Sequence, residues 1–240
     1  MIVYWVLAQC YVPVALFRGL FFYRGEKTPY SHAFIDGFLK LLFAARVIYV
    51  DPIMREKVRQ LDRCVLLYNH RSVADFTACM YTTAPDRVSY IGRLTAFIVF
   101  PVAFCFFYLV ENNFVLFNRG AKDRKKLKKR LFSGMLELVQ RGLFVVVFPE
   151  GHRNTEKTTL PLKRGAINWA YEQGLPCAIV LHDGNEDMIN EKALTFHRGV
   201  QIRCLHKGIY LPKDYSNRRA FFDTIASDFA QGYQDLIATK

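Results

Sequence analysis

A histidine and an aspartate with four residues between them follow a short apolar run in the stretch LLYNHRSVADF, residues 66–76. If the apolar run is a strand and Asp75 begins a helix, the Asp75 carboxylate can fold back onto one nitrogen of the His70 imidazole. That bond would fix the tautomer and leave the other nitrogen as a general base. A structural interpretation stays open, because Ser72 and Asp75 also read as a variant capping box at a helix start.

The same spacing occurs a second time, from His182 to Asp187 in the stretch HDGNED. The spacing alone therefore does not identify a catalytic pair. A metal-dependent phosphohydrolase that uses His70, His182, Asp183 and Asp187 is one alternative. The chain shows no recognised ligand spacing, so we expect no metal site.

A second polar cluster lies in FVVVFPEGHRN, residues 144–154. Pro149 halts the apolar run, Glu150 offers a carboxylate, and Gly151 permits a tight turn with exposed amides. Arg153 offers a two-pronged guanidinium to a phosphate or carboxylate, although Pro-Glu-Gly is also an ordinary surface turn. Further basic candidates are Arg119 at the end of FVLFNRG, and Lys163 before a helix in LPLKRG.

Short β-branched or aromatic runs alternate with longer helical patterns along most of the chain, which is typical of an α/β domain. We expect a central, mostly buried mixed sheet flanked by helices over residues 46–240. Ligands in such sheets bind beyond the carboxyl ends of strands, where both polar clusters fall. The expected strands are 46–50, 64–68, 114–117, 143–148, 177–181 and 208–211, and the expected helices are 73–83, 122–140, 163–173 and 217–237.

The composition is both apolar and basic: 52% of the residues are hydrophobic and the formal net charge is +12. This combination favours a membrane surface with anionic lipids, which attract basic side chains. Nucleic acid is not an expected partner, because the chain has no zinc-finger spacing, RNP-like signature or basic heptad region. The six cysteines are scattered, which indicates a reducing compartment.

Residues 1–45 are predicted to form a hydrophobic, helical membrane-associating segment. Between Met1 and Phe17 the strongly polar side chain is Gln9, and the segment either spans the bilayer or lies in one leaflet. A soluble core helix is the alternative. A removable signal peptide is not expected, and the basic residues that follow Phe17 favour a cytosolic position for the remainder.

Two further stretches have open interpretations. Residues 94–108 are apolar and interrupted by Pro101, which fits either a buried helix or an exposed wall for an acyl chain or lipid. The predicted helix 122–140 carries seven basic residues between 122 and 130 beside an apolar stripe. That face is either simply solvated or contacts anionic lipid or cofactor phosphates.

The polar clusters together resemble the glycerolipid acyltransferases, the family that includes 1-acylglycerol-3-phosphate acyltransferase. The order of the blocks carries the resemblance and favours His70 over His182, which we assign with Asp187 to a loop after a strand. Departures from the family pattern are His152, Asn154 and Ile179, and the first two leave the acceptor open. The matching blocks are Asn69-His70…Asp75, Arg119, Phe148 to Asn154, LPLKRG at 160–165 and Leu175 to Ile179.

The resemblance implies transfer of an acyl group from acyl-CoA, as co-substrate, to the free hydroxyl of a lysophospholipid, first of all 1-acylglycerol-3-phosphate. His70 would be the base and Asp75 its orienting partner, with no further cofactor. Asn69 would fix the histidine loop beside the substrate. Glu150 would bond a glycerol hydroxyl, and the Gly151 amide is a candidate oxyanion donor. Arg119, Arg153 and Lys163 would bind the acceptor phosphate.

Two alternatives stay open within this resemblance. The acceptor could be glycerol 3-phosphate or another lysophospholipid, or the chain could be a lipid-binding protein without catalysis. The expected location is a membrane with the active site on its cytosolic face. That membrane would be the endoplasmic reticulum in a eukaryote and the inner or plasma membrane in a bacterium.

Overall fold

The computed structural model describes residues 6, 10, 43–83, 87–93, 112–118, 122–190 and 195–238. Three expectations lie outside them: nearly all of the segment 1–45, the apolar stretch 94–108, and Arg119. Among the helices that the structure describes, none is both long and apolar enough to cross a membrane. Membrane association of residues 1–45, and their separation from a domain at 46–240, therefore stay predictions.

A seven-stranded mixed sheet forms the centre of the protein, in the order β1-β9-β6-β2-β5-β3-β4. The strands from β6 to β4 are parallel to one another, whereas β9 pairs antiparallel with β6, and β1 pairs parallel with β9. The strands are β1 (Arg46–Tyr49), β2 (Val65–Tyr68), β3 (Val88–Arg93), β4 (Phe114–Phe117), β5 (Phe144–Val147), β6 (Cys177–Asp183) and β9 (Gln201–Tyr210).

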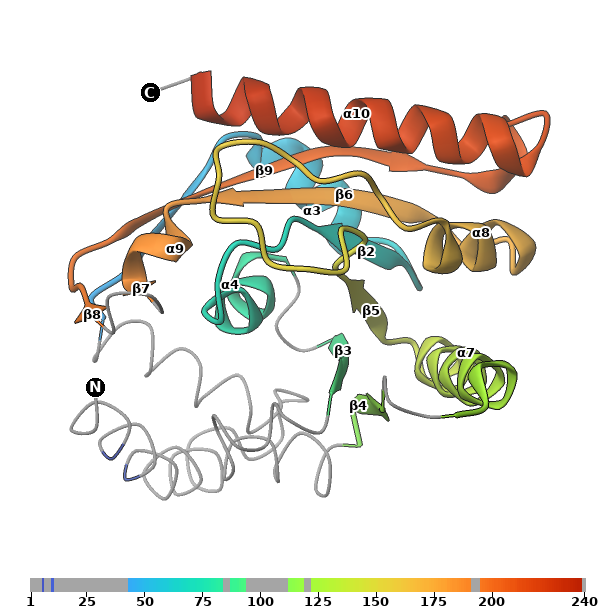
Figure 1. Cartoon of the computed structure of the whole chain (residues 1–240). Coiled ribbons are helices and arrows are strands. Elements are labelled where there is room, and N and C mark those ends of the chain that lie inside the picture. The colour runs from blue at the N-terminus through green and yellow to red at the C-terminus, as the bar shows by residue number, and fades with distance from the viewer. Residues whose placement is uncertain are drawn as a thin grey trace, which may run out of the picture.

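Helices cover both faces of this sheet (Figure 1). On one face lie α7 (Arg124–Gln140), α8 (Arg164–Glu172) and α10 (Arg218–Ala238), and on the other lie α3 (Pro52–Arg59) and α4 (Asp75–Thr82). Shorter elements complete the description: the helix α9 (Asn185–Met188), the 3₁₀ turn η3 (Pro212–Asp214), and the two-stranded ribbon of β7 (Ile189–Asn190) and β8 (Thr195–Phe196).

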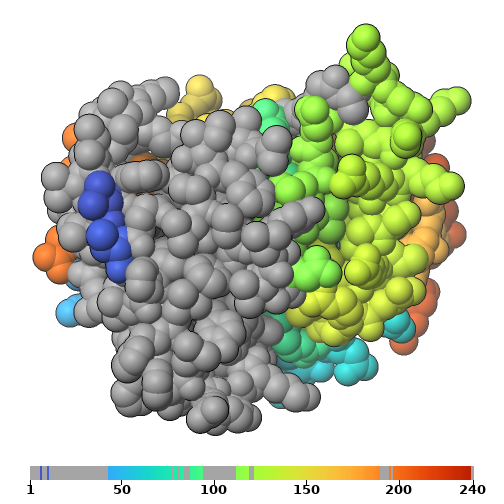
Figure 2. Space-filling view, turned by 90° about the horizontal axis from the view of Figure 1, so that it is seen from below, coloured from blue at the N-terminus to red at the C-terminus, as the bar shows by residue number. Residues whose placement is uncertain are grey.

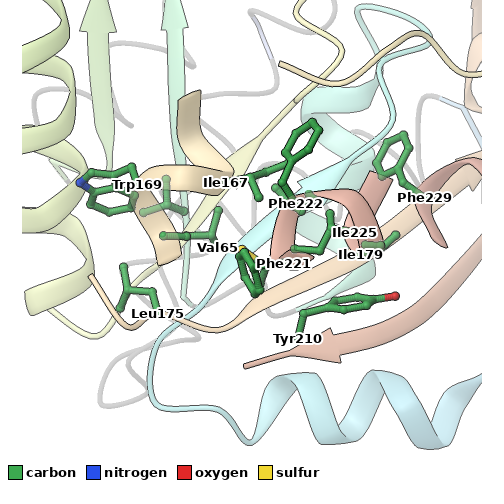
Figure 3. Packing of buried hydrophobic residues seen from close by; sticks show 14 of the residues in the cluster. Val65, Ile167, Trp169, Leu175, Ile179, Tyr210, Phe221, Phe222, Ile225 and Phe229 are labelled. Carbon is green, nitrogen blue, oxygen red and sulfur yellow. The ribbon is translucent and has the colours of Figure 1, made fainter. Parts of the chain in front are cut away.

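The strand β2 shows why the sheet is central. All four of its side chains are buried, and successive residues face opposite sides of the sheet. Val65 and Leu67 pack with the apolar faces of α7, α8 and α10, a cluster shown in part in Figure 3. Leu66 and Tyr68 pack on the other side with α3 and α4.

The predicted fold class, an α/β protein with a central mixed sheet flanked by helices, is confirmed. The sequence patterns missed β3 and α3 and located less than half of β9. In α3 a single residue, Val58, is fully buried, so its apolar stripe is weak. In β9 the buried face carries the polar His206 while Leu205 lies on the less buried face, so the residue types do not alternate as the burial does.

The helix α7 displays the basic face that the sequence indicates. Asp123 begins it, because its carboxylate accepts the Lys126 N–H at 2.9 Å. Met135, Leu138 and Val139 are buried against the sheet, and Figure 2 shows the yellow-green side chains of α7 projecting from the surface. The exposed basic residues are Lys122, Arg124, Lys125, Lys126, Lys128, Lys129 and Arg130.

Candidate active site

His70 and Asp75 meet directly beyond the carboxyl end of β2. His70 Nδ1 lies 2.6 Å from Asp75 Oδ2, since the chain leaves the strand, turns at residues 73–74 and begins α4 at Asp75. The imidazole stacks on the Phe148 ring, with 4.3 Å between centroids. Its side chain is 26% exposed, and no residue in the described part of the chain bonds Nε2. The ring is therefore fixed by Nδ1 and can receive a proton at Nε2.

The Asp75 carboxylate is completely buried and surrounded by donors. Oδ2 accepts the backbone N–H of Arg71 at 2.6 Å and that of Ser72 at 3.0 Å, and Oδ1 accepts the side-chain amide of Asn185. Burial raises the pKa of Asp75, while the bond and charge of His70 and the backbone donors oppose that rise. The start of α4 further favours a negative charge at this place.

The expected capping box at Ser72 and Asp75 is present only in part, because the N-cap of α4 is Ala74 and no side chain caps the helix. Ser72 instead takes part in the turn before α4. Its hydroxyl accepts the Ala74 N–H at 2.8 Å, while its own N–H is bound by Asp75. The turn and the histidine–aspartate pair are therefore one structure, in which a single carboxylate stabilises the turn and orients the imidazole.

The backbone of His70 is held on both sides by the loop that follows β5. Glu150 Oε2 accepts the His70 N–H at 2.7 Å, and the His70 carbonyl accepts the Asn154 N–H at 2.7 Å. Glu150 Oε1 accepts the Leu160 N–H at 2.8 Å. This loop therefore fixes the peptide that carries the base.

The Glu150 carboxylate binds backbone N–H groups and not, as we expected, a substrate hydroxyl. It is 2% exposed and both its oxygens accept backbone N–H groups. Burial raises its pKa, and the bonds from Leu160 and His70 act in the opposite direction. In this geometry Glu150 orients His70.

Gly151 and Lys163 lie side by side, next to the clamp that Glu150 and Asn154 form on the His70 backbone. Gly151 has a φ of +74°, and this left-handed conformation explains the glycine. A Cβ there would lie 3.4 Å from Lys163 Cγ, an ordinary contact. The Gly151 N–H donates to the Phe148 carbonyl at 3.0 Å, so the turn occupies the amide that we considered as an oxyanion donor. Lys163 and Arg153 are exposed, and both are within a few residues of the groups that hold His70.

Asn69 joins the two histidine stretches. Its Nδ2 donates to the His182 carbonyl at 2.7 Å and its Oδ1 accepts the His182 N–H at 2.8 Å. The side chain is 1% exposed. Asn69 therefore fixes the histidine loop to β6, and its amide faces the protein interior rather than the solvent.

The assignment of His182 and Asp187 to a loop is wrong. His182 lies within β6, is fully buried, and its Nε2 bonds the Thr82 hydroxyl at 2.9 Å. Asp187 lies on α9 and is exposed. The strand continues beyond the apolar run because His182 and Asp183 pair antiparallel with Cys204 and Arg203 of β9.

Acid should destabilise the protein through two buried histidines. Burial lowers the pKa of His182 and of His206 to about 3, whereas the unfolded chain protonates near its ordinary value of about 6.5. This contribution to stability is complete above pH 6.5 and is lost as the pH falls toward 3. At pH 4.5 it costs roughly 3 kcal/mol per histidine, measurable as the free energy of unfolding in urea at pH 7.5 and 4.5.

The matched variant is His206→Gln, which keeps a polar group opposite Thr83 but does not titrate. Its loss of stability between the two pH values should be smaller by about that amount. The raised pKa values of Asp75 and Glu150 act with the opposite sign and cancel in this comparison. An equal loss in both proteins would contradict the prediction.

Arg71 is a residue of the site that the sequence patterns missed. Its side chain is buried and its Nη1 donates to the carbonyls of Glu156 and Thr158. Its Nη2 lies 3.4 Å from Glu186 Oε1, and the guanidinium sits 5.0 Å above the Tyr233 ring. Arg71 thus ties the loop after β5, α9 and α10 to the histidine loop. Arginine is usually exposed, so its type gave no sign of this.

Over the part of the chain that the structure describes, no three His, Cys, Asp or Glu side chains are grouped to hold a metal ion. His70, His182, Asp183 and Asp187 in particular do not converge, because β6 holds the His182 ring against Thr82. The arrangement instead supplies an oriented, partly exposed imidazole with a buried carboxylate behind it. Such an imidazole can act as a general base that removes a proton from a hydroxyl.

A fold with a general base beyond the carboxyl edge of a mixed sheet is consistent with a group-transfer enzyme. Comparison of the chain with known protein families gives the same class. Residues 50–181, more than half of the chain, match the family described as Acyltransferase. The chain belongs to this acyltransferase family.

Curated relatives share this assignment. The chain is 23% identical over 181 residues to the 1-acyl-sn-glycerol-3-phosphate acyltransferase of Haemophilus influenzae, covering 75% of this chain and 73% of the relative. It is 26% identical over 208 residues to the human 1-acyl-sn-glycerol-3-phosphate acyltransferase beta, covering 80% and 71%. The crystal structure of the 1-acyl-sn-glycerophosphate acyltransferase PlsC from Thermotoga maritima has the same fold, with a TM-score of 0.74 over 99% of this chain and 95% of that one at 18% identity.

Proposed function

We propose that this enzyme transfers an acyl group from acyl-CoA to the free hydroxyl of a lysophospholipid. The first acceptor is 1-acylglycerol-3-phosphate, and the product is phosphatidic acid. The observation that carries the proposal is the His70–Asp75 pair, with Nδ1 bound at 2.6 Å and the imidazole partly exposed. The names of the relatives support the choice of acceptor.

The reaction needs one base and no covalent enzyme intermediate. His70 Nε2 takes the proton of the acceptor hydroxyl while the hydroxyl oxygen attacks the thioester carbonyl carbon. The new carbon–oxygen bond gives a tetrahedral intermediate, and the carbon–sulfur bond then breaks. The departing CoA thiolate takes the proton back from the imidazolium. Asp75 stabilises the imidazolium through Nδ1 during this exchange.

The acceptor phosphate is assigned to basic side chains near the base. Arg153 lies one residue before Asn154, whose N–H binds the His70 carbonyl. Lys163 packs beside Gly151, next to the Glu150 that binds the His70 N–H. Arg119 is the third candidate by its place in the motif order. Arginine and lysine suit a phosphate because they offer charge and N–H donors together.

The donor and the acceptor both carry lipid chains, so the enzyme works at a membrane. We assign that membrane an anionic surface, supported by the net charge of +12 and the exposed basic residues of α7. The active site would face the cytosol, at the endoplasmic reticulum in a eukaryote or the inner or plasma membrane in a bacterium. Acyl-CoA is the co-substrate, and no cofactor is needed for the chemistry.

An acceptor panel tests this proposal. Purified protein in detergent is given labelled acyl-CoA with 1-acylglycerol-3-phosphate, glycerol 3-phosphate or 1-acylglycerol-3-phosphocholine, with and without EDTA. We expect labelled phosphatidic acid with one thiol released per product, unchanged by EDTA. A different preferred acceptor would revise the substrate. Vesicle binding without acyl transfer to any acceptor would overturn the enzymatic proposal.

A further inference from the structure

The stretch HDGNED, which imitates the catalytic spacing, forms a tight turn directly behind the His70–Asp75 pair. Gly184 ends β6 with a φ of +93°, and a Cβ there would lie 2.3 Å from the Gln201 carbonyl oxygen of β9. Only glycine fits such a left-handed position at this close approach. The turn delivers Asn185 into the interior as the first residue of α9.

The Asn185 side chain is fully buried and points at the catalytic carboxylate. Its Nδ2 donates to Asp75 Oδ1, while the other carboxylate oxygen, Oδ2, holds His70 Nδ1. The orientation of the amide follows from chemistry, because a carboxylate surrounded by donors accepts from N–H and not from a carbonyl oxygen.

From this geometry we propose that Asn185 is a positioning residue that fixes the Asp75 carboxylate against His70, an inference that rests on the proposed function. The backbone N–H groups of Arg71 and Ser72 hold the carboxylate from the side of the turn. Asn185 adds a side-chain donor to Oδ1 from α9, which opposes rotation of the carboxylate and keeps Oδ2 aimed at Nδ1. The donor also stabilises the negative charge that in turn stabilises the imidazolium. Asn185 touches neither substrate and acts through Asp75.

A second contact keeps Asn185 in register with the pair. Asn69, next to His70, is bonded through both amide atoms to the His182 backbone three residues before Asn185. The loop after β2 and the turn after β6 therefore form one unit. The neighbouring strands β2 and β6 already place these two segments side by side, and the Asn69 bonds add a direct link between them.

The pH dependence of kcat in this test also depends on the charged and titratable groups near the His70–Asp75 pair. Asp75 faces the His70 imidazole and, within α4, the Cys79 thiol, whose pKa burial raises so that it stays neutral. Glu150 contacts the His70 backbone. The Arg71 guanidinium is engaged with Glu186.

The test compares Asn185→Ala and Asn185→Asp with the matched control Asp187→Ala, which removes an exposed side chain from the same short helix. Asn185→Ala should lower kcat roughly ten- to hundredfold, the size of a hydrogen bond to a charged group, with KM for both substrates within about twofold of wild type. The control should keep wild-type kcat. Circular dichroism and Tm report whether each variant is folded.

Asn185→Asp supplies a readout that a packing role would not move. Two carboxylates in contact share one proton, so at low pH a protonated Asp at 185 donates to Asp75 as the amide does. As the pH rises the two charges repel. The ratio of variant to wild-type kcat should therefore fall at least about tenfold between pH 6 and 9.

Each outcome of these measurements either supports or overturns the role proposed for Asn185. A kcat loss in the alanine variant together with a falling ratio in the aspartate variant supports the proposal. A folded alanine variant with wild-type kcat overturns it. If the alanine variant does not fold, the aspartate variant alone tests the proposal: a ratio of its kcat to the wild-type kcat that does not change with pH overturns it. Absence of acyl transfer in the wild type, by contrast, would defeat the proposed function itself.

Discussion

Replacing His70 with alanine should lower kcat by about 10²–10⁴-fold or more, the loss expected when a general base is removed. The fold should be retained, because the side chain is 26% exposed and the clamp from Glu150 and Asn154 binds only the His70 backbone. The measurement is the steady-state rate of phosphatidic acid formation from labelled acyl-CoA, together with Tm.

The matched control is His197→Ala, which removes an exposed histidine bonded to Thr195. It should have wild-type kcat. Activity of His70→Ala near wild type would remove the basis of the mechanism, since no other described histidine is both partly exposed and backed by a buried carboxylate.

Replacing Asp75 with asparagine should lower both kcat and stability. Asparagine has one acceptor oxygen, so its NH₂ group would face backbone N–H donors of Arg71 and Ser72 or the Asn185 amide. A buried donor left without an acceptor costs about 1–3 kcal/mol. The imidazole would also lose the charge that fixes its tautomer, and we expect kcat to fall by about 10²–10⁴-fold.

This variant is measured by kcat, KM and urea unfolding. Asp235→Asn is the control, because it also removes one carboxylate charge, from a surface pair with Lys207, and should leave kcat unchanged. A fall in stability with normal kcat would show that Asp75 serves the turn alone, as the capping interpretation holds.

The two variants also separate the roles within the pair. His70→Ala removes the group that takes the proton and leaves the turn intact, so its effect should be confined to kcat. Asp75→Asn disturbs a buried carboxylate that serves the imidazole, the turn and Asn185 together. It should therefore change kcat and the free energy of unfolding at once.

Much of the fold could be predicted from local pattern. The runs that became β2, β5 and β6 are apolar because strands buried on both faces need apolar side chains on both sides. α7 was recognisable from its apolar stripe. β9 and α3 are harder to predict, because β9 buries the polar His206 and leaves Leu205 on its less buried face, and α3 buries only Val58. Their place in the fold comes from pairing and packing with distant segments.

The site was predicted in part. The polar residues after strands 64–68 and 143–148 are predicted to lie beyond the carboxyl ends of strands, where ligands bind. The structure brings them together, because β2 and β5 are parallel neighbours and end at the same edge of the sheet. The hydrogen-bond partners of these polar residues are harder to predict from the sequence. Glu150 offered a carboxylate for substrate, yet the loop folds so that it binds the His70 and Leu160 backbones. Backbone donors are identical along the chain, so no sequence pattern marks which one a carboxylate will reach.

By itself the sequence determined the class of fold, the acyltransferase family and the candidate pair at His70 and Asp75, since these depend on local periodicity and on motif order. The tertiary structure decided what the second histidine stretch does. Its spacing suggested His182 and Asp187, but β6 buries His182 against Thr82, and the Gly184 turn presents Asn185 to Asp75. The physical reason is that a hydrogen bond across 110 residues of chain depends on strand register and a left-handed glycine, which no local pattern encodes.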